Sequence, residues 1–338
     1  MSKERIVYLD VVRIFACVMI IMMHAPIPNT GISSSVLVTD SVSTAPGVGL
    51  FVMVSGALLL PVKLPTVVFL KKRLSKLAFP VLFWTFFYMG VKLYGGSISI
   101  PDIPKSIISI PFSAQFNGVL WFVYMLIGLY LLAPIFSPWL EKVSRRELEL
   151  YLAIWAVTLC YPLVEKIIIV DERPEGVLYY FSGYVGYFLL GYYLRRYTPR
   201  IPLLICVFLI FLPLSVGAYC KFYDVKVSFY DVFWYLSVLT VGAAIGWFSI
   251  IQRQIPLRQK PRLSCCVSLI SNCCFGVYLS HIFLMRTILW RWEMLQNTGG
   301  VIQIVITTVL TFVGCLIITW LISKLPFGGY IVGYNSKG

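Results

Sequence analysis

Charge is scarce in this chain of 338 residues: only 12% of its residues are charged, 14 are acidic and two are histidines. Hydrophobic residues make up 59%, and the mean hydropathy is +0.86. This composition excludes a soluble globular protein and indicates a polytopic membrane protein. No stretch resembles a second, soluble domain and no internal repeat stands out, so we expect one integral-membrane domain over residues 1–338.

The chain also lacks the Cys-x-x-Cys spacing of a zinc site. Its nine cysteines lie mostly within apolar runs, and the pairs Cys265-Cys266 and Cys273-Cys274 are adjacent residues. We interpret them as small packing residues and expect neither a metal nor a disulfide.

Apolar runs long enough to span a bilayer predict an all-α membrane bundle of about ten transmembrane helices. The first run resembles a signal peptide in position only. Asp10 and Arg13 interrupt its apolar core, so we expect it to be retained. The ten predicted spans cover residues 6–24, 46–62, 77–94, 117–137, 148–166, 177–194, 201–220, 229–250, 263–289 and 301–323.

The distribution of basic residues predicts the orientation. The loops and ends assigned to one side hold 19 lysines and arginines, whereas the opposite loops hold 7. Because basic loops stay in the cytoplasm, both termini should be cytoplasmic, in a multi-pass protein of the inner cell membrane. The net charge of +14 is then explained by contact with anionic membrane lipids, and no nucleic-acid partner is expected.

Arg13 and His24 are ionisable residues within the first predicted span. At helical geometry they share nearly one face and lie about 16 Å apart along the axis. Ionisable side chains at this depth are costly and usually face a functional cavity. Asp10, three residues before Arg13, is placed to pair with it. The alternative is a structural Asp-Arg pair with a histidine that only touches lipid headgroups.

The second histidine, His281, falls on the ninth predicted span, which also rises from the cytoplasm. Both histidines of the chain therefore lie in outer membrane halves. A shared polar cavity that opens outward would explain their position, and each could act as a base or as a group that orients substrate. A histidine that serves only in packing is the alternative for His281.

Lys72, Arg73 and Lys76 crowd the cytoplasmic end of the third predicted span. At helical spacing their side chains can share one quadrant and bind phosphates. Ordinary anchoring by positive charge is the alternative explanation. Together with Arg13 and His24, this cluster would place phosphate-binding cations at the inner membrane surface, one cation partway across the membrane and a base at the outer end. This layout suits coenzyme A, which carries phosphates at one end of a long acyl-bearing arm.

The sequence resembles the integral-membrane acyltransferase family 3. That family has an Arg or Lys, ten residues and then His on its first helix, as Arg13 and His24 do here. The strings Phe51–Gly56 and Leu120–Tyr124 resemble its Phe-x-x-x-Ser-Gly and Leu-Trp-Phe elements. The string Phe275–His281 is similar to its Phe-Gly-x-Tyr-Leu-x-His element. Where many members carry Arg-x-x-Arg, this chain has Arg73-x-x-Lys76, which keeps the charge but loses one bidentate phosphate contact.

The resemblance implies transfer of an acyl group, most often acetyl, from cytoplasmic acyl-CoA to a hydroxyl of a cell-surface polysaccharide or its lipid-linked precursor. We expect the membrane domain to complete the transfer itself, without a fused esterase-like domain. Lys72, Arg73 and Lys76 would hold the CoA phosphates. Arg13 would steer the thioester arm or offset developing charge. His24 would act either as a general base or as a transient acyl acceptor, two routes that the sequence does not separate.

The acceptor would meet aromatic and hydroxyl side chains. Trp121 and Tyr124 are candidates for an acceptor cavity, with Tyr278 beside His281 and a hydroxyl from Ser55. Packing or lipid contact is the alternative for the aromatic residues, and close helix approach is the alternative for the Ser-Gly pair. The oligomeric state stays open, with a homo-oligomer among the options.

Two rival classes remain. A transporter or flippase for a glycan precursor or an anionic metabolite would use Arg13 and the histidines to bind its cargo. Such a protein predicts internal repeats with broken helices and no thioester cleavage. A membrane scaffold that recruits partners would leave the intramembrane Arg13 and His24 without a role.

Overall fold

A computed structural model describes residues 5–28, 32–112, 118–160, 183–225, 229–255 and 261–335. In these ranges every regular element is helical, which confirms the predicted all-α membrane architecture. Within the same ranges, seven helical segments are long and apolar enough to cross a membrane. They are Val7–His24, Ser34–Leu59, Thr66–Tyr94, Gly118–Lys142, Leu203–Phe222, Leu263–Arg291 and Gly300–Ser323.

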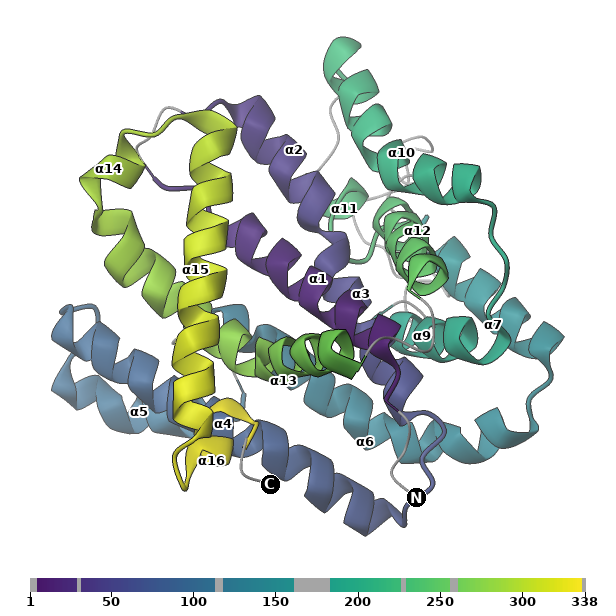
Figure 1. Cartoon of the computed structure of the whole chain (residues 1–338), viewed down its shortest axis with the longest axis horizontal. Helices are drawn as coiled ribbons and strands as arrows, with labels where there is room; N and C mark the ends of the chain where they lie inside the picture. The colour runs from purple at the N-terminus through teal and green to yellow at the C-terminus, as the bar shows by residue number, and fades with distance from the viewer. Residues whose placement is uncertain are drawn as a thin grey trace.

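The helices form a bundle around α1, α3 and α9, with α10 and α15 at its periphery (Figure 1). The longer helices are α1 (Val7–His24), α2 (Ser34–Thr44), α3 (Pro46–Leu59), α4 (Thr66–Tyr94), α6 (Trp121–Lys142), α7 (Arg145–Thr158), α9 (Val185–Tyr197), α10 (Leu203–Phe222), α12 (Val238–Gln254), α13 (Pro261–Phe283) and α15 (Gly300–Ser323). Short helices are α5 (Ile103–Ser109), α11 (Phe229–Val232), α14 (Glu293–Gln296) and α16 (Gly328–Val332), with a π-helical turn at Leu284–Ile288 directly after α13.

Three of the ten predicted spans do not appear at full length. They correspond to α7, α9 and α12, with 14, 13 and 17 residues. Residues 161–166 and 177–182 of two of these spans lie outside the described ranges. The count of ten crossings and the cytoplasmic position of both termini therefore stay predictions.

Two helices begin earlier than the apolar runs suggested. Ser33 caps α2 by accepting a hydrogen bond from the Val36 N–H, and α2 and α3 together form a 26-residue segment where a span from residue 46 was expected. Likewise, α4 begins at Thr66, so Lys72, Arg73 and Lys76 are helical. Hydropathy does not detect either start, because polar residues at a helix end lower the mean hydropathy although the backbone there is still helical.

Helices α3 and α9 approach each other closely at two glycines. A Cβ added at Gly56 would overlap the Phe188 carbonyl, and one added at Gly191 would overlap the Met53 carbonyl. Small residues permit such close approach between membrane helices. This contact fixes the end of α9, with Arg195 and Arg196, beside the end of α3.

We predict that Gly191→Ala destabilises the protein by about 2 to 3 kcal/mol, because the added methyl group forces α3 and α9 apart. Gly128→Ala is the matched control, since a Cβ at this position in α6 meets no atom within 4 Å. The control should be neutral or slightly stabilising because alanine favours the helix. Thermal unfolding in detergent measures both. Equal melting temperatures for the two variants would contradict the importance of this contact.

Candidate active site

The two histidines of the chain meet in space. His24 ends α1 and His281 lies near the end of α13, 257 positions later in the sequence. Their ring centroids are 5.3 Å apart with an interplanar angle of 67°. His281 is fully buried, whereas His24 is partly exposed. The structure thus brings together the two rarest titratable side chains of the protein.

Backbone contacts determine which nitrogen of each ring carries the proton. His24 Nδ1 lies 2.7 Å from the Ile20 carbonyl oxygen, and His281 Nδ1 contacts the Tyr278 carbonyl. A carbonyl can only accept, so each Nδ1 must be the donor, and each neutral ring then has a lone pair on Nε2. His281 Nε2 is buried and has no hydrogen-bond partner within the described ranges. Both rings are therefore poised to accept a proton or to attack a carbonyl through Nε2.

A cation stands near this pair. Arg286, on the π-helical turn after α13, is close enough to act electrostatically on both histidines. Its guanidinium lies over the Trp290 ring, 5.3 Å from the centroid. Single π-helical turns occur frequently at functional sites. Sequence reasoning left Arg286 without a role, although an arginine five residues after His281 in an apolar run was a usable signal.

Aromatic side chains surround the histidines. The Tyr278 ring lies 5.8 Å from His281 and its hydroxyl donates to the Val119 carbonyl. Trp121 stacks on Tyr235 at 5.4 Å, and the Tyr235 hydroxyl lies 3.3 Å from the sulfur of Met23, the neighbour of His24. Tyr278 and Trp121 are therefore close to the pair, directly or through Tyr235.

Tyr124 was predicted to line the cavity for the acceptor substrate, but its hydroxyl is bound in another contact. Its hydroxyl donates to the Ile110 carbonyl at 2.6 Å, which anchors α6 to the end of α5. Any contribution of Tyr124 to an acceptor cavity would come from its partly exposed ring.

At the opposite end of α1, Asp10 is the centre of a polar cluster. Arg5 donates to both carboxylate oxygens, at 2.6 and 3.1 Å, and Ser271 of α13 donates to the carboxylate at 2.7 Å. Arg13, the expected partner, is 3.8 Å away and donates to the Ser271 hydroxyl at 3.1 Å. The predicted Asp10–Arg13 pair is thus present but secondary. Arg5 is the closer cation because it approaches the carboxylate with two N–H groups.

This arrangement leaves positive charge on Arg13. One carboxylate faces two guanidinium groups, and Arg5 makes the shorter contacts. The cluster therefore carries one net positive charge. The Arg13 side chain is 26% exposed, so its remaining N–H groups can serve a ligand.

A tyrosine connects this cation with the predicted phosphate cradle. The Tyr130 hydroxyl is within hydrogen-bonding reach of Ser55 and within electrostatic reach of both Arg13 and Arg73. Ser55 itself donates to the Phe51 carbonyl at 3.0 Å. Side chains from α1, α3 and α4 therefore all act on this one tyrosine of α6.

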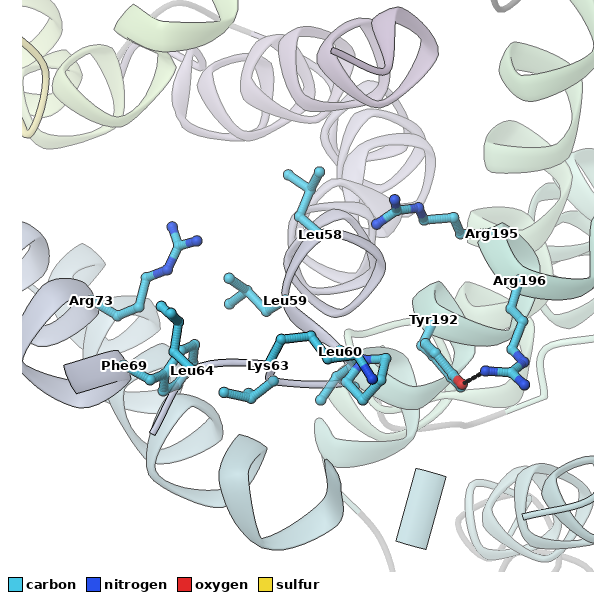
Figure 2. Close-up of a pocket in the computed structure, with 12 residues that line it drawn as sticks. Leu58, Leu59, Leu60, Lys63, Leu64, Phe69, Arg73, Tyr192, Arg195 and Arg196 are labelled. Atoms are coloured by element: carbon cyan, nitrogen blue, oxygen red, sulfur yellow. Dashed lines mark hydrogen bonds between the residues drawn. The ribbon is translucent and has the colours of Figure 1, made fainter. Parts of the chain in front are cut away.

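Arg73 faces a pocket of about 370 Å³ at the ends of α3, α4 and α9. Figure 2 shows Arg73 and Arg195 extending from opposite sides, with the end of α3 between them. Arg195 donates to the Ala57 carbonyl, and Arg196 donates to the Tyr192 hydroxyl at 2.7 Å. Arg73 Nε is buried and lacks a hydrogen-bond partner in the described part of the chain. The pocket is thus a basic site with an unused donor.

Of the three α4 residues that were predicted to bind phosphates, only Arg73 lines this pocket. Lys72 and Lys76 are exposed and do not line the pocket, whereas Arg195 and Arg196 of α9 do. Sequence reasoning assigned the two arginines to membrane topology. Their position directly after a run of buried residues, Gly186–Leu194, was the available signal.

The fold and site define the class of protein: a polytopic helical membrane protein with a histidine pair between two candidate membrane spans and a basic pocket. A family model described as an acyltransferase domain matches residues 6–320. The chain therefore belongs to the acyltransferase 3 family, and the predicted resemblance is confirmed. No curated protein and no solved structure matches it.

We predict that Asp10→Ala costs about 2 to 4 kcal/mol of stability, because it leaves Arg5 and Arg13 as uncompensated charges beside Ser271. Asp102→Ala is the control. This carboxylate is exposed and accepts hydrogen bonds from its neighbour Ser99, so its removal should change stability little. Denaturant titration in detergent compares the two variants. If Asp10→Ala unfolds no earlier than Asp102→Ala, the cluster does not hold α1 to α13.

Proposed function

We propose that the protein is a membrane O-acyltransferase. It takes an acyl group, most often acetyl, from cytoplasmic acyl-CoA and transfers it to a hydroxyl of a cell-surface polysaccharide or lipid-linked glycan precursor at the inner cell membrane. Membership of the acyltransferase family supports an acyl donor and an acceptor. The observation that carries the specific proposal is the contact of His24 with His281, both with Nδ1 bound to a backbone carbonyl.

The donor would enter through the basic pocket. Arg73, Arg195 and Arg196 present guanidinium groups around it, and guanidinium groups bind phosphates well. Arg73 Nε, which has no partner in the described chain, is free to bind one of them. Lys72 and Lys76, which are exposed on the same helix, would attract the anionic donor from outside the pocket.

Arg13 would guide the thioester arm. It shares the neighbourhood of Tyr130 with Arg73, and it lies about 16 Å below His24 along α1. At that separation its charge acts only weakly at His24. We therefore assign it steering of the extended arm, and we assign the stabilisation of developing charge near the histidines to Arg286.

In the direct route, His24 Nε2 accepts the proton of the acceptor hydroxyl while the hydroxyl oxygen attacks the thioester carbonyl. The carbon–sulfur bond breaks as the tetrahedral intermediate collapses, and the imidazolium returns the proton to the departing CoA sulfur. His281 Nε2 accepts a hydrogen bond from a second hydroxyl of the acceptor, and this contact holds the acceptor in place. Trp121 and Tyr278 would provide apolar ring surfaces for the acceptor sugar.

In the covalent route, His24 Nε2 itself attacks the thioester carbonyl and CoA leaves as the thiolate. His281 then takes the proton of the acceptor hydroxyl as that hydroxyl attacks the acyl-imidazole, and His24 is regenerated. The second histidine gives this route a separate base. Both routes need His24, but only the covalent route leaves an acylated residue when the acceptor is withheld.

We predict that His24→Ala lowers acyl transfer by about 100-fold or more, as expected for loss of a general base or nucleophile. The measurement is free-thiol release from acetyl-CoA by the purified protein in liposomes, with and without candidate glycolipid acceptors. Met22→Ala, two residues earlier on α1, is the control for local packing. Thiol release that persists in His24→Ala would refute the role of His24. Absence of both release and CoA binding in the wild type would favour a transporter.

We further predict that Arg73→Gln raises the KM for acyl-CoA by about tenfold or more, because it removes a guanidinium–phosphate contact within the pocket. Lys72→Gln removes the same charge from the adjacent, exposed position and should change KM by less than about twofold at moderate salt. Initial rates over a range of acetyl-CoA concentrations test the pair. Equal effects would indicate general attraction by surface charge instead of a defined pocket.

A further inference from the structure

A second basic pocket lies on the other side of Arg195. It has a volume of about 830 Å³ and is formed by the start of α1, the turn between α9 and α10, and the end of α12. Arg195, Arg200 and Arg253 line it, from the end of α9, that turn and α12. The chain thus places three guanidinium groups around one cavity at the ends of its helices.

No carboxylate neutralises these charges within the described part of the chain. The residues that line the pocket include no carboxylate, and neither Arg200 nor Arg253 forms an ion pair in the described ranges. Ser249 also lines the pocket, and its hydroxyl is buried without a hydrogen-bond partner in the same ranges. Unpaired arginines together with an unused hydroxyl match an anion with several acceptor oxygens, such as a phosphate group.

The surroundings favour a lipid as the source of that phosphate. The wall formed by Pro199–Pro202 leads directly into α10, whose first residues Leu203, Leu204 and Ile205 are 46%, 80% and 47% exposed. An exposed apolar helix in a membrane protein faces acyl chains. A headgroup in the pocket would therefore have its chains beside α10. Basic pockets between helix ends on the cytoplasmic side are typical sites for anionic lipid headgroups.

We propose that this pocket, lined by Arg200 and Arg253, binds the phosphate-bearing headgroup of an anionic lipid of the cytoplasmic leaflet. The site is distinct from the basic pocket lined by Arg73, because the two share only Arg195 among their lining residues. Arg195 donates to the Ala57 carbonyl, so it forms a wall between them. Binding of the lipid requires no acyl transfer and is independent of the proposed enzymatic activity.

The test compares lipid binding by the full-length protein in detergent, with native mass spectrometry as the readout. Phosphatidylglycerol is titrated against phosphatidylcholine for the wild type, Arg200→Gln/Arg253→Gln and a control pair, Lys142→Gln/Arg146→Gln. The control removes two exposed basic charges from the predicted cytoplasmic ends of α6 and α7. We expect the pocket pair to weaken binding of the first phosphatidylglycerol by about tenfold or more, and the control pair by less than about twofold.

Other outcomes would overturn the proposal. Equal weakening in both pairs would show that surface charge alone attracts the lipid, and unchanged binding would show that the pocket is not used. A parallel titration with coenzyme A separates the two phosphate sources. If the pocket pair weakens coenzyme A binding and leaves phosphatidylglycerol binding intact, the cavity belongs to the acyl donor. Since both arginines are exposed, the variants should fold, and Arg253→Gln alone provides the same comparison.

Discussion

The hydrogen-bonded cluster around Asp10 sets the register between α1 and α13. Arg5, Asp10 and Ser271 fix the helices at one end of their contact, and His24 meets His281 at the other. A shift of one residue along α13 would turn His281 by about 100° away from α1. Because burying Asp10 without its partners would cost several kcal/mol, the cluster strongly disfavours other registers. A charge network far from the histidines thereby determines that their rings meet.

Composition predicted a helical membrane protein because every residue of a membrane span has to be compatible with the lipid environment. Helices α7, α9 and α12, with 14, 13 and 17 residues, are shorter than the spans that hydropathy predicted there. Residues Gly186–Leu194 of α9 are buried within the protein, where a helix need not match the thickness of the bilayer. Five of them are glycine or tyrosine, which reduces the hydropathy of the run. Hydropathy measures transfer into lipid, and for a helix enclosed by other helices it indicates neither length nor ends.

Sequence reasoning could identify those residues of the candidate site whose type is rare in apolar runs. Arg13, His24 and His281 were found because ionisable groups are exceptional in apolar runs. Arg195 and Arg196 were not, since arginines at helix ends are common and the positive-inside rule accounts for them without a site. Their convergence with Arg73 depends on the glycine contact between α3 and α9, which spans 135 positions from Gly56 to Gly191. A contact of this sequence separation leaves no local signal. The positive-inside rule also accounts for Arg5 at the N-terminus, so its role as the main partner of Asp10, only five positions later, was not recognised.

The buried Nε2 of His281 is the least favourable polar group of the histidine pair, because it lacks a partner in the described structure. Such a group costs about 1 to 3 kcal/mol. Evolution could remove this cost with an apolar residue of similar size, and helix packing alone would tolerate that change. Retaining an imidazole whose Nδ1 is fixed by the Tyr278 carbonyl makes sense when something else donates to Nε2 during turnover. An acceptor hydroxyl is such a donor, and it would be held where His24 can reach it. Native proteins accept local energetic conflicts of this kind mainly at functional sites.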